Sequence, residues 1–127
     1  MVWSDPTYCS SVCFQDNPRG LGSLFNGEAI LNFLNNNSFR RIIRSHQCVQ
    51  NGSSASFGDK CITVFSATSY NDLQNNYSAV LKIYQNSNQI KVCNFPPIQR
   101  LQKSEAVYYK FQKDISKKKN SCLFFII

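Results

Sequence analysis

The sequence contains one histidine, His46, and only seven acidic residues among its 127 positions. A metal site needs several His, Cys, Asp or Glu ligands, and Cys9, Cys13 and His46 do not have the spacing of a usual zinc module. Spacing alone therefore predicts that His46 is an ordinary loop histidine with neither a metal nor an acid–base role.

Long apolar runs and targeting signals are also absent. No segment approaches the roughly 20 apolar residues of a membrane helix, and residues 1–30 lack the basic start and apolar core of a secretory signal. The six cysteines include no C-x-x-C pair. Without a secretory signal we interpret these cysteines as reduced thiols, and we expect a cytoplasmic or nuclear protein with no membrane span.

Acidic residues are outnumbered by 14 lysines and arginines, which gives a net charge of +7. Such a charge favours encounters with acidic, phosphorylated or nucleic-acid partners. Residues 103–117 are rich in lysine and carry apolar side chains at helical spacing, which predicts a basic helix. Packing explains its apolar side more simply than nucleic-acid binding does, so nucleic acid is not an expected partner.

The length suits about one small domain. We predict a strand end at residues 1–4, a long turn-rich loop at 5–24 and a helix at 27–35 capped by Asn26. A second, polar loop is expected at residues 68–77. Strands are predicted at 40–44, 61–66, 78–84 and 89–95. This order indicates the α/β class, in which loops that follow strands commonly carry the chemistry.

Arg19 lies in the segment Asn17-Pro18-Arg19-Gly20-Leu21-Gly22. A guanidinium fork matches phosphate oxygens, and neighbouring glycines let the backbone come close to them. Arg19 is therefore a candidate phosphate ligand, although the segment alone is more typical of a solvent-exposed loop arginine. A serine hydrolase is not indicated, because no G-x-S-x-G segment is present.

Several segments in a fixed order point to a known family. They are Trp3-Ser4-Asp5-Pro6, Asn17-Pro18-Arg19-Gly20-Leu21-Gly22, Ile42-Ile43-Arg44-Ser45-His46-Gln47, Ile62-Thr63-Val64-Phe65-Ser66-Ala67-Thr68-Ser69-Tyr70 and Ala79-Val80-Leu81. Together they resemble the C-terminal half of the phosphoprotein phosphatase (PPP) family of serine/threonine phosphatases, which have the calcineurin-like metallophosphoesterase fold. The type 5, EF-hand-containing and type 1 members are the most similar, and the resemblance covers residues 2–93.

The resemblance implies the C-terminal portion of a β-sandwich flanked by helices at residues 1–95, followed by a basic extension at 96–127. In the complete family domain two divalent ions, of the manganese, iron or zinc type, activate water for attack on phosphoserine or phosphothreonine in protein substrates. Regulatory subunits are further expected partners. By the same resemblance His46 is a metal ligand, Arg19 clamps the phosphate, Tyr70 lines the site and Asp5 supports it.

The family's motifs Gly-Asp-x-His-Gly, Gly-Asp-x-x-Asp-Arg-Gly and Gly-Asn-His-Glu have no counterpart here. One histidine and one aspartate cannot hold two divalent ions, so we expect this chain by itself to be inactive. Two other functions stay open. The chain could be a non-catalytic interaction protein that binds phosphoproteins or regulatory partners, or a basic nucleic-acid or anionic-surface binder.

Overall fold

The computed structural model describes residues 3–72, 75–84, 87, 89–99, 104–105 and 107. The helix expected at 103–117 and the apolar end of the chain lie outside the described residues, apart from three positions. The prediction of a basic extension at 96–127 is therefore left as a prediction.

The first sheet contains β1 (Asp5–Pro6), β2 (Phe14–Asp16) and β3 (Ser23–Phe25) in the order β1-β3-β2. β1 runs parallel to β3 and β2 antiparallel to it. The prediction of one long loop over residues 5–24 is therefore wrong. The three strands have only two or three residues each. β1 pairs with β3 across the intervening β2, which local β propensity does not report.

Helix α1 (Gly27–Asn36) follows β3 directly and confirms the helix predicted at 27–35. The side-chain oxygen of Asn26 accepts a hydrogen bond from the backbone N–H of Ala29, as an N-cap does. Glu28 in the first turn complements the helix dipole. Ala29, Ile30 and Leu34 are buried along one side of the helix.

The second sheet contains β4 (Ile42–Arg44), β5 (Ser53–Ser56) and β6 (Cys61–Val64) in the order β4-β6-β5. β4 is parallel to β6 and β5 is antiparallel to it. The strands predicted at 40–44 and 61–66 are confirmed with trimmed ends. β5 was not predicted, because its sequence Ser-Ser-Ala-Ser has no β-branched or aromatic residue.

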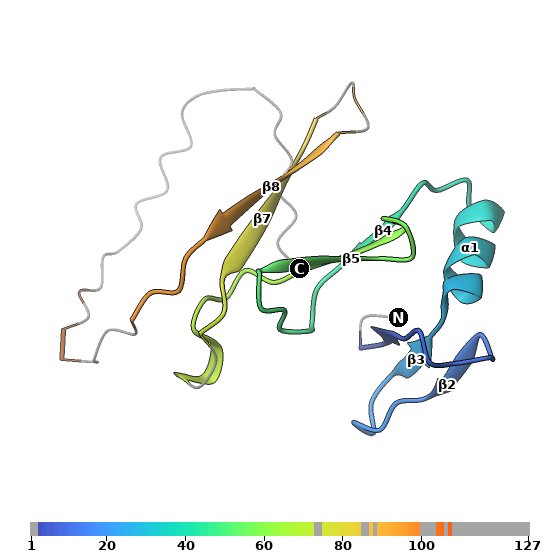
Figure 1. Ribbon diagram of the computed structural model, residues 1–127, viewed down its shortest axis with the longest axis horizontal. Coiled ribbons are helices and arrows are strands. Elements are labelled where there is room, and N and C mark those ends of the chain that lie inside the picture. Colours follow the sequence, from blue (N-terminus) through green and yellow to red (C-terminus); the bar gives the residue numbers. More distant parts are fainter. Residues whose placement is uncertain are drawn as a thin grey trace.

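The third sheet is an antiparallel hairpin of β7 (Ser78–Ile83) and β8 (Ile90–Phe95), as predicted. Figure 1 shows the hairpin at the opposite end of the molecule from α1, with β4 and β5 between them. The Ala79 N–H donates to the Phe65 carbonyl at 2.8 Å, which joins β7 to the segment after β6. Gly52 lies against the backbone of Ser78 and Ala79, so only glycine fits at this contact.

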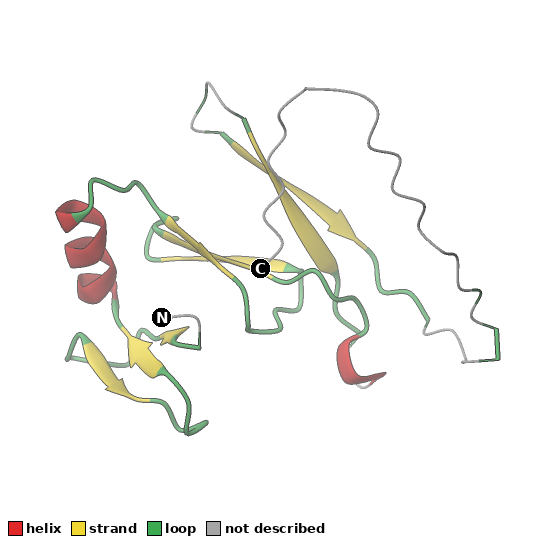
Figure 2. Cartoon of the chain, turned by 180° about the vertical axis from the view of Figure 1, so that it is seen from behind, coloured by secondary structure: helices red, strands yellow, loops and turns green. Residues whose placement is uncertain are grey.

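The hydrophobic core lies between α1 and the first two sheets. It contains Phe25, Ala29, Ile30, Leu34 and Cys61, with Ile42 and Phe57 packed partly against it. Figure 2 shows α1 on one side of these short strands. A single helix and small mixed sheets in the described residues fit a partial α/β domain. No helix among these residues is long and apolar enough to cross a membrane.

Candidate functional site

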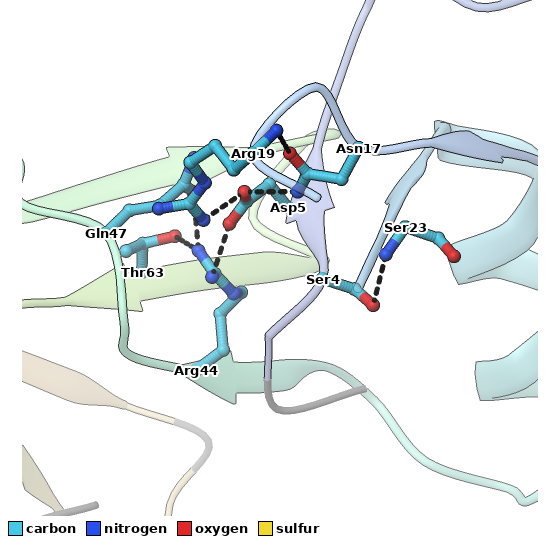
Figure 3. A network of polar contacts seen from close by, with 8 residues as sticks. All are labelled: Ser4, Asp5, Asn17, Arg19, Ser23, Arg44, Gln47 and Thr63. Atoms are coloured by element: carbon cyan, nitrogen blue, oxygen red, sulfur yellow. Dashed lines mark hydrogen bonds and ion pairs between the residues drawn. The ribbon is translucent and has the colours of Figure 1, made fainter. Parts of the chain in front are cut away.

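The candidate site is built around the buried carboxylate of Asp5 in β1. Its Oδ2 atom accepts hydrogen bonds from Asn17 Nδ2, at 2.8 Å, and from Arg19 Nη2. Its Oδ1 atom accepts one from Arg44 Nη2 at 2.9 Å. Figure 3 shows the two guanidinium groups meeting at this carboxylate. β1 pairs in parallel with β3 and forms one edge of the first sheet, so Asp5 lies at this edge.

Arg19 comes from the loop between β2 and β3, and Asn17 shapes this loop. The side-chain oxygen of Asn17 accepts the backbone N–H of Arg19 at 3.0 Å, while its amide donates to Asp5. Gly20 donates to the Asn17 carbonyl and has a φ of 75°, a conformation that glycine adopts readily. The Arg19 side chain is 47% exposed, so its guanidinium can reach a ligand in solvent while Asp5 holds it.

Arg44 ends β4 and lies beneath the same carboxylate with only 9% of its side chain exposed. Its Nη1 atom donates to Gln47 Oε1 at 2.6 Å and to Thr63 Oγ1 at 3.2 Å. Burial lowers the pKa of its guanidinium, and the charge of Asp5 opposes that shift. Arg44 was not among the residues predicted for the site. The only signal was an arginine at the end of an apolar strand, two residues before His46.

The cluster holds one carboxylate and two guanidiniums, so its formal charge is +1. Asp5 and Arg44 are buried, and the excess positive charge is therefore presented by Arg19. Such an arrangement favours an anion that offers oxygen acceptors, which is how arginine binds phosphate. The structure thus brings together Asp5 and Arg19, two of the four residues predicted for the site.

His46 lies in the loop that follows β4, between Arg44 and Gln47 of the cluster. Its φ of 80° is uncommon for a residue other than glycine. Its ring packs edge-on against Trp3, with 4.4 Å between ring centroids. In the part of the chain that the structure describes, no three His, Cys, Asp or Glu side chains group as metal ligands do. The residues present therefore do not form a divalent-ion site by themselves.

Tyr70 lies in the 3₁₀ turn η1 (Tyr70–Asp72), within the loop predicted at 68–77. Its ring packs edge-on against Phe65, with centroids 5.2 Å apart, and the residue is 42% exposed. Ser69 and Asn71, on either side of it, both have positive φ angles, of 48° and 58°. Among the described residues no hydrogen bond joins Tyr70 to the Asp5 cluster.

Asn76 holds the Tyr70 loop, although it was not among the residues predicted for the site. It is fully buried. Its side-chain oxygen accepts the Tyr70 N–H at 2.9 Å, and its amide donates to the carbonyls of Ala67 and Tyr77 at 2.8 and 2.9 Å. Its own carbonyl accepts from Thr68 Oγ1 at 3.2 Å. One asparagine among many in this sequence gives no signal of such a role.

Comparison with known proteins shows what the chain is similar to. It is 40% identical over 83 residues to the serine/threonine-protein phosphatase BSL2 of Arabidopsis thaliana, which covers 64% of this chain and 8% of that protein. It is 30% identical over 122 residues to the mouse (Mus musculus) serine/threonine-protein phosphatase with EF-hands 1, covering 90% of this chain and 19% of the relative. No family model matches the chain.

A solved structure agrees with these sequence matches. It is a protein serine/threonine phosphatase from Saccharomyces cerevisiae with similarity to human phosphatase PP5. The two are 28% identical with a TM-score of 0.66, over 78% of this chain and 33% of the yeast chain. Both fold and sequence are thus similar to those of serine/threonine phosphatases. The chain belongs to the phosphoprotein phosphatase family, as the ordered motifs indicated, and spans 8% and 19% of the lengths of the two curated relatives described above.

Proposed function

We propose that this chain is the phosphate-binding, C-terminal portion of a PPP catalytic domain, and that its ligand is the phosphoryl group of phosphoserine or phosphothreonine in proteins. The observation that carries the proposal is the half-exposed Arg19 guanidinium, held by the buried carboxylate of Asp5. A fixed guanidinium loses less side-chain entropy on binding than a free one, so it is a better anion ligand than a mobile surface arginine.

Each predicted residue has a part in this proposal. Arg19 binds phosphoryl oxygens, Asp5 orients Arg19, and the hydroxyl of Tyr70 lines the site. His46 is proposed as one ligand of the two divalent ions of a complete domain, where such ions would activate the attacking water. The described residues do not form that ion site, so no catalytic step is assigned to this chain alone. Regulatory subunits are proposed as its protein partners.

Phosphate binding is tested by calorimetric titration of the full chain with inorganic phosphate in a phosphate-free buffer. We expect Arg19→Gln to weaken binding at least tenfold, because it removes the charged fork that contacts the anion. Arg40→Gln is the matched control. Arg40 is exposed, and its substitution removes the same charge from a position outside the cluster. Equal loss in both variants would indicate attraction by net charge alone and would contradict the proposal.

Inactivity is tested with p-nitrophenyl phosphate and added Mn²⁺. We expect no hydrolysis above that of buffer and metal, because the residues that the structure describes do not form a site for two ions. Hydrolysis that copurifies with the chain and disappears in His46→Ala would contradict this expectation.

A further inference from the structure

We propose that Arg44 is a positioning residue that neutralises Asp5, so that Arg19 keeps its positive charge available to a phosphate. This inference rests on the proposed phosphate-binding role of Arg19. It assigns to Arg44 no contact with the ligand. Its effect passes through the Asp5 carboxylate, which both arginines share.

The two carboxylate oxygens of Asp5 are divided between the two arginines. Oδ1 bonds Arg44, whereas Oδ2 bonds Arg19 and Asn17. The arginines differ in exposure, since 9% of the Arg44 side chain and 47% of the Arg19 side chain reach solvent. Only Arg19 can therefore meet a ligand, and Arg44 serves as the buried counter-charge (Figure 3).

Arg44 is fixed independently of Asp5. Its Nη1 atom is bonded to Gln47 in the loop after β4 and to Thr63 in β6. Parallel pairing places Arg44 and Thr63 opposite each other in the second sheet. The guanidinium is thus anchored to the second sheet and reaches across to Asp5 in the first. Nε is the one buried side-chain nitrogen or oxygen without a hydrogen-bond partner within the described residues.

The anchored Arg44 charge sets the net charge that a phosphate meets at Arg19. With Arg44 present the cluster is +1, and a phosphate meets a net attraction. Without Arg44 the buried carboxylate and Arg19 would form a neutral pair, and Asp5 would repel the phosphate at short range. Charges interact strongly where water is excluded. We expect Arg44→Gln to weaken phosphate binding at least tenfold, which corresponds to about 1.4 kcal/mol.

A purely structural role for Arg44 makes a different prediction. If Arg44 merely holds the sheets together, removal of Asp5 as well should leave phosphate binding weak. If Arg44 acts by neutralising Asp5, the double variant Asp5→Asn/Arg44→Gln restores the net charge of +1. It also keeps a side-chain oxygen that can accept from Arg19, so it should recover part of the binding that Arg44→Gln loses. Removing both partners of a buried pair also costs less stability than removing one.

The experiment compares the wild type, Arg44→Gln, Arg44→Lys and the double variant. Each full chain is titrated with inorganic phosphate, and its unfolding is followed by circular dichroism. We expect Arg44→Lys to bind within about threefold of the wild type, as it retains the charge balance. We expect the double variant to bind more tightly than Arg44→Gln but more weakly than the wild type, because it regains the charge balance and loses the carboxylate that holds Arg19. We expect Arg44→Gln to bind at least tenfold more weakly while it is still folded.

The outcomes separate this proposal from the one on which it rests. If the wild type does not bind phosphate, or Arg19→Gln binds normally, the proposed function and this inference both fail. If Arg19→Gln loses binding but folded Arg44→Gln does not, only the role of Arg44 fails. Should Arg44→Gln not fold, the double variant decides. Recovery of folding and binding supports neutralisation, and failure of either overturns it.

Discussion

Arg19 and Tyr70 are held in place by different kinds of interaction. Arg19 is held by charges, through a carboxylate that a second guanidinium also contacts. Tyr70 is held through its backbone by the neutral amide of Asn76, which bonds three main-chain groups. Both supports are buried, although the residues that they position are exposed.

This difference determines what should destabilise each of the two regions. A charged cluster depends on the balance of its partners, because one charge left alone in a buried site costs several kcal/mol. An amide that satisfies several backbone groups depends on shape and hydrogen-bond geometry, and neither is altered by salt or by nearby charges. Substitutions at Asp5 and at Asn76 should therefore differ in the size of their effects and in their response to salt.

Asp5→Ala should give the largest effect. It removes the carboxylate that Arg19 and Arg44 share and leaves the buried Arg44 without this counter-charge. We expect the free energy of unfolding to fall by about 3–5 kcal/mol, as it does when one partner of a buried ion pair is removed. Urea unfolding followed by circular dichroism measures the change.

Asp16→Ala is the matched control, because Asp16 is an exposed aspartate in β2 of the same sheet. Its loss should change stability by less than about 0.5 kcal/mol. Equal effects of the two substitutions would mean that the cluster is no more important than a surface charge.

Asn76→Ala should follow, with a loss of about 2–3 kcal/mol. It leaves the carbonyls of Ala67 and Tyr77 and the N–H of Tyr70 without their side-chain partner. In 0.5 M NaCl this loss should be unchanged, since no charge is involved. The neighbouring Asn75 is exposed, and Asn75→Ala should be close to neutral in the same urea assay. A salt-dependent loss of stability in Asn76→Ala would contradict the view that this support involves no charge.

Arg19→Gln should destabilise the fold by less than about 1 kcal/mol, because its ion pair is half exposed to water and salt. Arg44→Gln should destabilise it more, because the same carboxylate then loses its buried partner. Thermal unfolding of both variants in one buffer tests this order. The opposite order would mean that exposure does not decide the strength of these pairs.

The sequence predicted some elements of this structure well, because the residues that determine them lie close together in the chain. Helix α1 has a cap and an apolar face within ten residues, and the β7–β8 hairpin pairs neighbouring segments. β1, β2, β3 and β5 have only two to four residues each, and β1 pairs with β3 across the intervening β2. Their backbone hydrogen bonds are not visible in local composition.

The candidate site divides in the same way. Arg19 and Asp5 were predicted from ordered motifs, and the structure joins them. Arg44 and Asn76 were not assigned, because their importance comes from burial and from hydrogen bonds that residue type does not reveal. Arg44 meets a residue 39 positions before it, and Asn76 closes a loop that contains three backbone groups bonded to its side chain. Neither relation follows from residue type or spacing.

The smallest effect concerns Cys61, which lies in β6 with Thr63 of the charged cluster. Burial raises the pKa of the Cys61 thiol above its ordinary 9.0, and the charge of Arg44 opposes this shift. The folded chain thus keeps the proton when the unfolded chain has lost it. Stability from this thiol is fully present below pH 9.0 and falls as the pH rises through the folded-state pKa.

We expect the free energy of unfolding of Cys61→Ala to decline less between pH 8 and about pH 10.5 than that of the wild type. Lysines and tyrosines titrate in the same range but are common to both chains, so the difference isolates Cys61. Cys93→Ala in β8 is the control, because Cys93 is only half-buried and lies outside the charged cluster. If both variants decline as the wild type does, the Cys61 thiol titrates alike in the folded and unfolded chains, which would contradict the raised pKa. A steeper decline in Arg44→Gln than in the wild type would show that the charge of Arg44 lowers the pKa of the buried Cys61 thiol.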